Sequence, residues 1–262
     1  MAERDGGVIT FDFEHYNLTE EDVDKMISDA TFYLLVADQK KSVIKRLDLM
    51  KTCEINKKHR QVQEYVLNRA AHILLDTFGI RVGEMDEKRG HYILTNALAE
   101  AERNHPFLDF SEKEVGQMGI IFTVLGLIFM NNGKVSEDVL FKFLAGLGIE
   151  NSRDLVDLYD EDLKKYVNDV LVSKQHYLRR SKVQGAEADK EYYEYEWGDR
   201  AEAEVKKSDV LKMVCQVYDV EPRMFKEQYD LVKNAEELTD EDFLPPPPPA
   251  GAAVPVQQID ID

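Results

Sequence analysis

Cysteine is scarce in this chain of 262 residues, which contains only Cys53 and Cys215. The two residues lie far apart, and neither stands in a CxxC or CxxH pattern. This scarcity argues against a disulfide framework and against a zinc site, and it is typical of proteins of a reducing compartment. We therefore expect no metal to be bound here.

Long apolar runs and a secretory leader are also lacking. The longest apolar run, residues 118–130, is shorter than the roughly 20 residues that a membrane-spanning helix needs. The first 16 residues do not have the basic-then-apolar order of a secretory signal. We expect neither a secreted nor a membrane-spanning protein.

Motifs of catalysis are absent from the sequence. It contains no P-loop, no dinucleotide-type glycine fingerprint, no HExxH and no GxSxG. The six histidines are scattered, and none pairs with a cysteine at a spacing that suggests a nucleophile or a ligand set. We therefore expect no enzyme activity, no catalytic residue and no cofactor.

Basic residues are outnumbered, since 33 lysines and arginines face 51 acidic residues and the net charge is −18. The distribution of charge matters more than this sum. Residues 1–29 hold nine acids and two bases, and residues 234–262 hold seven acids and no base. Residues 30–98 hold twelve bases and eight acids, so this part of the chain is mildly basic.

The apolar spacing indicates a first block of three helices and two strands. Thr19 is the expected N-cap of a helix whose apolar stripe extends to Ala37, and further helices are expected at 43–52 and 59–78. Gly79 is expected to end the third helix in a left-handed conformation. Strands are expected at 80–85 and 91–94, joined by a turn.

A second block repeats this order. Its helices are expected at 114–131, from Ser136 to about 146 and at 160–173, and its strands at 177–183 and 191–197. Asp199 and Glu202 form an expected capping box for a helix from Arg200 to about Tyr218. Pro222 is expected to open a last short helix.

Three helices followed by a two-stranded wing are typical of a winged helix. We predict a mainly α fold with small β wings, built as tandem winged-helix domains. The predicted parts are an acidic disordered N-terminus (1–18), winged helix A (19–98), a linker (99–113), winged helix B (114–233) and an acidic, proline-rich disordered tail (234–262). Five consecutive prolines favour an extended rod in that tail, either as a spacer or as a docking peptide for a proline-binding module.

The stretch EYYEYEW, residues 191–197, contains four aromatic residues and raises the possibility of a base-stacking surface. In a strand, Tyr193, Tyr195 and Trp197 share one face, while Glu194 and Glu196 lie on the other. Acidic neighbours repel phosphates. We therefore expect these aromatics to pack on the core under the wing.

Several stretches together resemble the MAGE homology domain family over about residues 30–232. They are LLVADQKK (34–41), IKR (44–46), FG (78–79), YIL (92–94), VLGLIFM (124–130) and YEYEWGDR (193–200). The Y-E-x-x-W-G-x-R signature is the most specific of these, although the family commonly has proline where this chain has Asp199. Within the family, the runs LLVxDQKK and VLGLIFM are most similar to the necdin-related branch that serves as a non-SMC subunit of the DNA-repair SMC complex, the one that is neither cohesin nor condensin.

The resemblance implies a non-catalytic subunit that binds a RING-type ubiquitin ligase subunit and a kleisin subunit. It also implies that the trio promotes ubiquitin ligase activity and helps the complex engage double-stranded DNA, which places the protein in the nucleus on chromatin. A di-leucine on the family's first helix contacts the RING partner, and the matching residues here are Leu34 and Leu35. The apolar spacing places Leu34 on the buried stripe and Leu35 off it. The kleisin-contact residues stay unassigned.

Basic residues gather in the first block where winged helices normally approach DNA. The candidate DNA-binding residues are Lys40, Lys41, Lys45, Arg46, Lys51, Lys57, Lys58, Arg60, Lys88 and Arg89. Binding by such residues is expected to be directed at phosphates, independent of sequence and sensitive to salt. A second cluster, Lys174, Arg179, Arg180 and Lys182, has no acid among its sequence neighbours. For both clusters, an ordinary solvated basic face stays an alternative.

Two other functions fit the same sequence. One is a general MAGE adaptor that directs another RING ligase to substrates without a chromosome role. The other is a winged-helix transcription regulator that binds a defined DNA site.

Overall fold

The structure, a computed structural model, describes residues 14–85, 88–98, 111–149, 162–184 and 191–243. It divides the chain into two compact units, residues 1–206 and 207–262. The domain boundaries drawn from the sequence stay a prediction.

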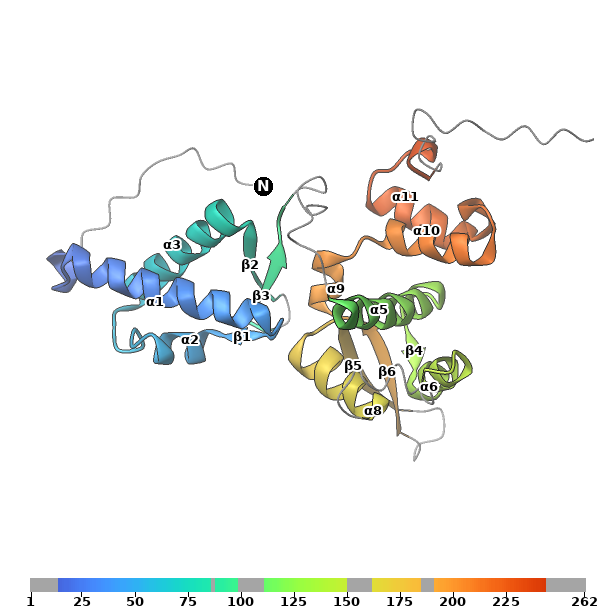
Figure 1. Cartoon of the computed structure of the whole chain (residues 1–262), viewed down its shortest axis with the longest axis horizontal. Coiled ribbons are helices and arrows are strands. Elements are labelled where there is room, and N and C mark those ends of the chain that lie inside the picture. Colours follow the sequence, from blue (N-terminus) through green and yellow to red (C-terminus); the bar gives the residue numbers. More distant parts are fainter. Residues whose placement is uncertain (1–13, 86–87, 99–110, 150–161, 185–190, 244–262) are drawn as a thin grey trace, which may run out of the picture. The chain divides into compact units, whose positions relative to one another are not determined.

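The first unit begins with a winged helix that contains a three-stranded antiparallel sheet of order β1-β3-β2 (Figure 1). Its elements are η1 (Glu14–Tyr16), α1 (Glu20–Gln39), β1 (Ile44–Lys45), α2 (Arg46–Thr52), α3 (Arg60–Phe78), β2 (Ile80–Glu84) and β3 (His91–Asn96). The helix order and the two-stranded wing are those predicted from the sequence.

Local signals set the ends of α1 and α3 as predicted. The Thr19 side chain accepts a hydrogen bond from the Asp22 backbone, and the Asp22 carboxylate accepts one in return, which completes a capping box. Gly79 ends α3 with a φ of 63°, in the left-handed region that glycine enters at little cost.

The helix predicted at 43–52 was wrong at its start. Ile44 and Lys45 form strand β1, which pairs with Tyr92 and His91 of β3, and α2 begins only at Arg46. A strand of two residues is too short to show the alternation of apolar and polar residues. Only its pairing with another strand identifies it. Strand β4 (Val135–Ser136) in the second winged helix was missed for the same reason.

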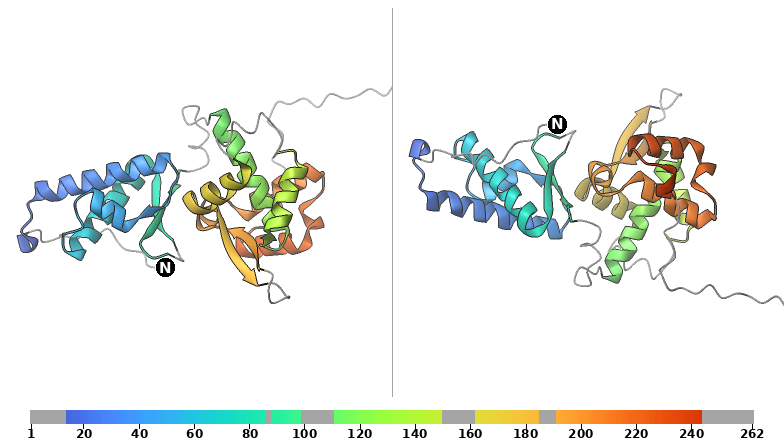
Figure 2. Two further views of the ribbon diagram at one scale, coloured as in Figure 1. Left: turned by 90° about the horizontal axis from the view of Figure 1, so that it is seen from below. Right: turned by 90° about the horizontal axis from the view of Figure 1, so that it is seen from above.

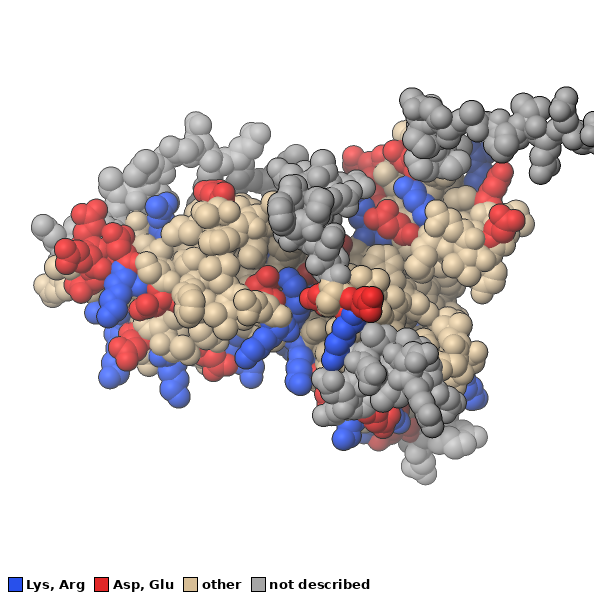
Figure 3. Space-filling model, in the orientation of Figure 1, with Lys and Arg blue, Asp and Glu red and all other residues tan. Residues whose placement is uncertain are grey.

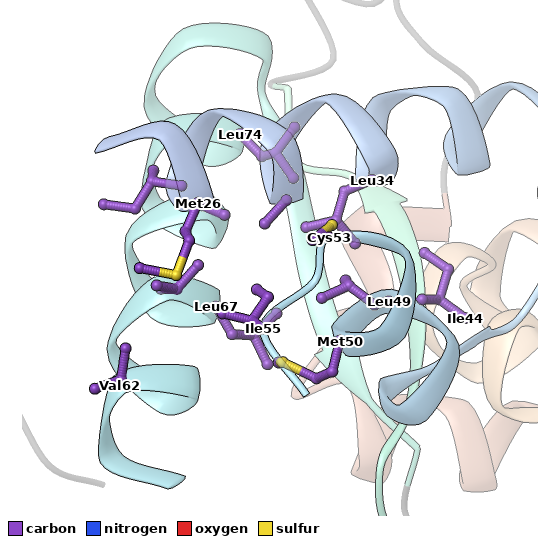
Figure 4. Packing of buried hydrophobic residues seen from close by; sticks show 14 of the residues in the cluster. Met26, Leu34, Ile44, Leu49, Met50, Cys53, Ile55, Val62, Leu67 and Leu74 are labelled. Atoms are coloured by element: carbon purple, nitrogen blue, oxygen red, sulfur yellow. The ribbon is translucent and has the colours of Figure 1, made fainter. Parts of the chain in front are cut away.

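The core of the first winged helix joins α1, α2, α3 and the sheet. Figure 4 shows Met26 and Leu34 of α1 facing Leu49 of α2 and Leu67 and Leu74 of α3. Leu34, Leu49 and Leu74 are fully buried. Each such leucine contributes roughly 1.5–3 kcal/mol relative to an exposed one, so burial of this stripe holds the helices together.

A second winged helix follows in the same unit. Its elements are α5 (Glu112–Met130), β4, α6 (Glu137–Gly146), α8 (Leu163–Lys165), the π-helix η3 (Tyr166–Lys174), β5 (Leu178–Gln184), β6 (Glu191–Trp197) and α9 (Asp199–Glu204). The sheet order is β4-β6-β5, and Figure 2 shows the β5–β6 hairpin extending beyond the helices as a wing. The predicted mainly helical, tandem winged-helix fold is confirmed.

Helix α5 is the one described helix that is long and apolar enough to cross a membrane, judged by length and composition alone. In this fold it is a core helix. Leu125 and Ile128 are fully buried, and the Leu125 carbonyl accepts a hydrogen bond from the Trp197 indole at 3.0 Å.

The aromatic strand β6 packs inward as predicted for two of its residues. Tyr195 is fully buried and Trp197 nearly so. Burial raises the pKa of Tyr195 to about 12, and its hydroxyl donates to the Asn168 side chain at 2.8 Å. Tyr193 lies farther out on the hairpin, where the Arg180 guanidinium stacks on its ring at 3.5 Å. Tyr192 and Tyr193 stay exposed on this strand, so core packing accounts for Tyr195 and Trp197 only.

The capping box predicted at Asp199 was wrong. Gly198 is the N-cap of α9, no side chain caps this helix, and the helix ends at Glu204 instead of continuing to Tyr218. The Asp199 carboxylate instead lies 3.2 Å from the His176 ring and 3.5 Å from Arg179. These two partners precede it by about twenty residues along the chain, so the local motif did not reveal them.

The second unit is a small helical group. It contains α10 (Lys207–Tyr218), η4 (Pro222–Met224), α11 (Lys226–Ala235) and η5 (Asp240–Phe243). Val210 and Leu211 of α10 and Val232 of α11 are fully buried. The Glu236 carboxylate accepts hydrogen bonds from the Ser208 backbone and hydroxyl, at 3.1 and 2.6 Å, which ties the end of α11 to the start of α10.

Candidate nucleic-acid and partner interfaces

The structure brings the candidate cations of α2 and the wing together. Lys45 pairs with His91 across the sheet, and the Arg46 backbone N–H donates to the Gly90 carbonyl at 2.7 Å. Lys88 and Arg89 directly precede Gly90 and are exposed. Candidate cations more than forty positions apart in the sequence therefore lie on neighbouring segments of the chain.

The remaining candidates lie at the end of α1, on α2 and in the α2–α3 corner. Lys40, Lys51, Lys57, Lys58 and Arg60 are all exposed. Lys41 is half-buried and forms an ion pair with Asp38 at 2.8 Å, so its charge is partly compensated. Figure 3 shows Lys and Arg side chains projecting along one edge of this winged helix, with acidic side chains between them. We call these ten residues the basic edge.

The second basic cluster is largely compensated by acids. Arg180 forms an ion pair with Glu137 at 2.6 Å, Lys182 pairs with Glu191, and Arg179 lies beside Asp199. Burial alone would raise the pKa of Glu137, but hydrogen bonds from Lys164 and Arg180 together lower it, so this carboxylate stays charged. These ion pairs leave the cluster with less net charge for phosphates than its sequence suggested.

The matching di-leucine has one buried and one half-buried member. Leu34 is fully buried in the core shown in Figure 4, whereas Leu35 is half-buried at the edge of that core. Leu34 is therefore closed to a partner while this core is intact. Leu35 has apolar surface left for contact.

A groove along α1 was not predicted from the sequence. Its volume is about 600 Å³, and it is lined by α1 residues Met26, Phe32, Tyr33 and Val36 and by Cys53. Phe32 is 69% exposed. Apolar residues at positions 32 and 36, one helical turn apart and off the buried stripe, are the sequence signal that could have indicated this surface.

The arginine of the W-G-x-R signature joins the two winged helices. Arg200 is fully buried, and its guanidinium donates to the Leu94 carbonyl at 2.7 Å and to the Lys41 carbonyl at 3.1 Å, both in the first winged helix. It also donates to the Gln175 carbonyl and to Glu204, at 2.8 and 2.9 Å. The backbone N–H of Val43 adds a further bond, to the Lys174 carbonyl at 2.9 Å.

The glycine of the same signature allows a close backbone approach within the second winged helix. A Cβ at Gly198 would lie 2.2 Å from the His176 carbonyl oxygen. We expect Gly198→Ala to lower the free energy of unfolding by about 1–3 kcal/mol, the usual cost of overpacking, as measured by chemical denaturation. The control is Gly119→Ala in α5, where a Cβ meets nothing within 4 Å and alanine favours the helix. Equal stability of the two variants would contradict this account.

Metal chemistry finds no support in the described residues. Among them, no group of three or more histidine, cysteine or acidic side chains is placed to hold a metal ion.

Comparison with known proteins agrees with this architecture. The MAGE homology domain matches residues 32–208. The non-structural maintenance of chromosomes element 3 homolog of Homo sapiens is 30% identical over 235 residues, covering 90% of this chain and 73% of that protein. The Mus musculus protein of the same name is 31% identical over 89% of this chain and 79% of its own length.

One further relative and one solved structure are informative about the function. Melanoma-associated antigen D2 of Homo sapiens is 32% identical over 77% of this chain but only 32% of its own length. Among solved structures, a chain of the Nse1-Nse3-Nse4 complex matches 82% of this chain and all of its own length, with a TM-score of 0.71 and 30% identity. These matches cover both winged helices and the signature that contains Arg200. They support the prediction of a non-catalytic protein. The chain belongs to the MAGE homology domain family.

Proposed function

We propose that this chain is the MAGE-type, non-catalytic subunit of the DNA-repair SMC complex. In this role it binds a RING-type ubiquitin ligase subunit and a kleisin subunit, promotes ubiquitin ligase activity and helps the complex engage double-stranded DNA. It works in the nucleus, on chromatin. The observation that carries the proposal is the likeness to a chain of the Nse1-Nse3-Nse4 complex over 82% of this chain, at 30% identity.

The RING partner is proposed to contact α1 through Leu35. This side chain is half-buried and leaves apolar surface at the edge of the core, whereas Leu34 is fully buried. Contact through Leu35 therefore needs no opening of the core. Desolvation of an apolar side chain at the centre of an interface commonly supplies much of its affinity.

We expect Leu35→Asp to weaken binding of the RING subunit at least tenfold, because the new carboxylate would be buried without a partner. Isothermal titration calorimetry with the purified subunit measures this. The matched control is Val139→Asp, the same kind of change at an exposed apolar side chain of α6 in the second winged helix. Unchanged affinity of a folded Leu35→Asp protein would exclude Leu35 from the interface.

The DNA contact is proposed to lie on the basic edge. Its cations come from the end of α1, from α2 and its corner with α3, and from the wing, and most of them are exposed. Three of the ten are in ion pairs with acids of the same winged helix. Such a surface suits phosphates of any sequence, and its affinity should fall steeply with salt.

Reconstitution tests the proposed assembly. The full chain, the kleisin subunit and the RING subunit are expressed together and passed through size-exclusion chromatography. We expect one stoichiometric complex that binds duplex DNA and has more ubiquitin ligase activity than the RING subunit alone. Separate elution of the kleisin subunit would overturn the proposal.

A general MAGE adaptor is the second candidate. It is favoured by the likeness to melanoma-associated antigen D2, which is 32% identical over 202 residues. In that case the chain would bind a RING ligase and would not retain the kleisin subunit.

A further inference from the structure

A single carboxylate lies between two arginines of the basic edge. Glu64 Oε1 is 2.8 Å from Arg60 Nε and 4.0 Å from Arg46 Nη2. Arg60 precedes Glu64 by one turn of α3, whereas Arg46 belongs to the start of α2. The two cations thus converge on one anionic group from separate segments of the chain.

The position of Arg46 is held by the wing. Its backbone N–H donates to the Gly90 carbonyl at 2.7 Å, and the Gly90 N–H in turn donates to the Glu84 carboxylate at 2.6 Å. The exposed Lys88 and Arg89 lie directly before Gly90. The carboxylate of Glu64 therefore lies where the α2–α3 corner meets the wing, between the two halves of the basic edge.

This carboxylate is charged and easily displaced. A hydrogen bond from Arg60 lowers the pKa of Glu64, and the charge of Arg46 adds to the effect. The Glu64 side chain is 44% exposed and that of Arg60 is 82% exposed. Exposed ion pairs of this kind are weak. A phosphate has more acceptor oxygens than a carboxylate and also contacts neighbouring cations, so it competes well with Glu64 for Arg60.

We propose that Glu64 occupies the place of a DNA phosphate between Arg46 and Arg60 and acts as a built-in competitor that lowers the affinity of the basic edge for duplex DNA. A backbone phosphate displaces the carboxylate and takes over both guanidinium groups. The inference rests on the proposed function, because it concerns the regulation of the same DNA-binding surface.

The test compares two variants of the full chain that remove the same charge. Glu64→Gln removes the competing carboxylate, and Asp76→Asn removes an exposed carboxylate of α3 that is twelve residues further along, about 18 Å away at the helical rise. Binding of a fluorescent 20-base-pair duplex is measured by anisotropy over a series of salt concentrations.

We expect Glu64→Gln to bind the duplex about threefold to tenfold more tightly than the wild-type chain at low salt. Asp76→Asn should stay within twofold of the wild type. Adding Arg46→Gln to Glu64→Gln should remove the gain, because the phosphate then loses one of its two guanidinium partners.

Other outcomes separate this inference from the proposed function. Wild-type binding with no gain in Glu64→Gln overturns the inference and leaves DNA binding in place. Equal gains in Glu64→Gln and Asp76→Asn also overturn it, since net charge then explains both. If neither the wild type nor Glu64→Gln binds the duplex, the proposed DNA engagement and the inference are overturned together.

Discussion

Replacing Arg200 with methionine is expected to lower the free energy of unfolding by about 3–5 kcal/mol, the usual cost of removing one partner of a buried ion pair. The Arg200 guanidinium is fully buried and donates to three backbone carbonyls and to Glu204. Methionine has a similar length but no donors. Glu204 would lose its cationic partner, and the three carbonyls would lose their hydrogen bonds.

Because single domains are stable by only about 5–15 kcal/mol, such a loss is large enough to unfold part of the chain. Two of the acceptors, Leu94 and Lys41, belong to the first winged helix, so the contact between the winged helices should loosen first. Urea denaturation of the full chain measures the loss, and a second transition is expected where the wild type has one.

Two control variants make this result specific. Arg69→Met changes an exposed arginine of α3 and should stay within about 0.5 kcal/mol of the wild type. Arg200→Lys keeps the charge, but an ammonium group lacks the planar fork of a guanidinium and cannot donate to all four acceptors. Its free energy of unfolding should lie between those of the wild type and Arg200→Met. An Arg200→Met protein as stable as Arg69→Met would show that this junction does not depend on the guanidinium.

Reversing the charge of Lys40, Lys41, Lys45 and Arg46 is expected to abolish duplex binding. Four phosphate contacts correspond to a salt dependence with a slope of about −3.6, so wild-type affinity should fall roughly 100-fold between 50 and 200 mM salt. Replacing these cations with glutamate removes the attraction and adds repulsion. A gel-shift assay on a duplex of arbitrary sequence measures both effects.

The matched control reverses four exposed lysines outside the basic edge, Lys142, Lys165, Lys206 and Lys226. It changes the net charge by the same amount and should leave duplex binding within a few-fold of the wild type. Circular dichroism melting confirms that both variants are folded. Loss of binding in the control as well would assign the effect to net charge, and unchanged binding in the first variant would remove the basic edge from the DNA contact.

The sequence predicted the features that neighbouring residues determine. Thr19 and Asp22 are three positions apart, and Gly79 needs only its own backbone freedom, so the ends of α1 and α3 were predicted correctly. The buried face of β6 followed from the alternation of side chains along a strand, with Tyr195 and Trp197 in the core.

Features that join distant residues were not predicted. Arg180 had no acid among its sequence neighbours, yet Glu137 compensates it from 43 positions away. Arg200 reaches the Lys41 carbonyl across 159 positions, and no local pattern marks that bond. The ten residues of the basic edge were recognised by type, but only the paired strands β1 and β3 place Lys45 and Arg46 beside the wing tip.

The signature stretch YEYEWGDR thus has a structural role in this chain. Trp197 holds α5, Gly198 lets two backbone segments approach, and Arg200 bridges the winged helices. The cations proposed to meet DNA lie in the first winged helix, more than a hundred positions earlier in the sequence. The signature therefore identifies the family and shapes the fold, while the proposed contacts lie elsewhere.

The central claim is that this MAGE protein is a subunit of the SMC complex for DNA repair. Affinity capture of the full chain from its own cells, followed by mass spectrometry of the bound proteins, tests it most directly. The account predicts recovery of a kleisin subunit and a RING-type subunit in near-equal amounts, together with SMC proteins. Recovery of a RING ligase without any kleisin or SMC protein would contradict it.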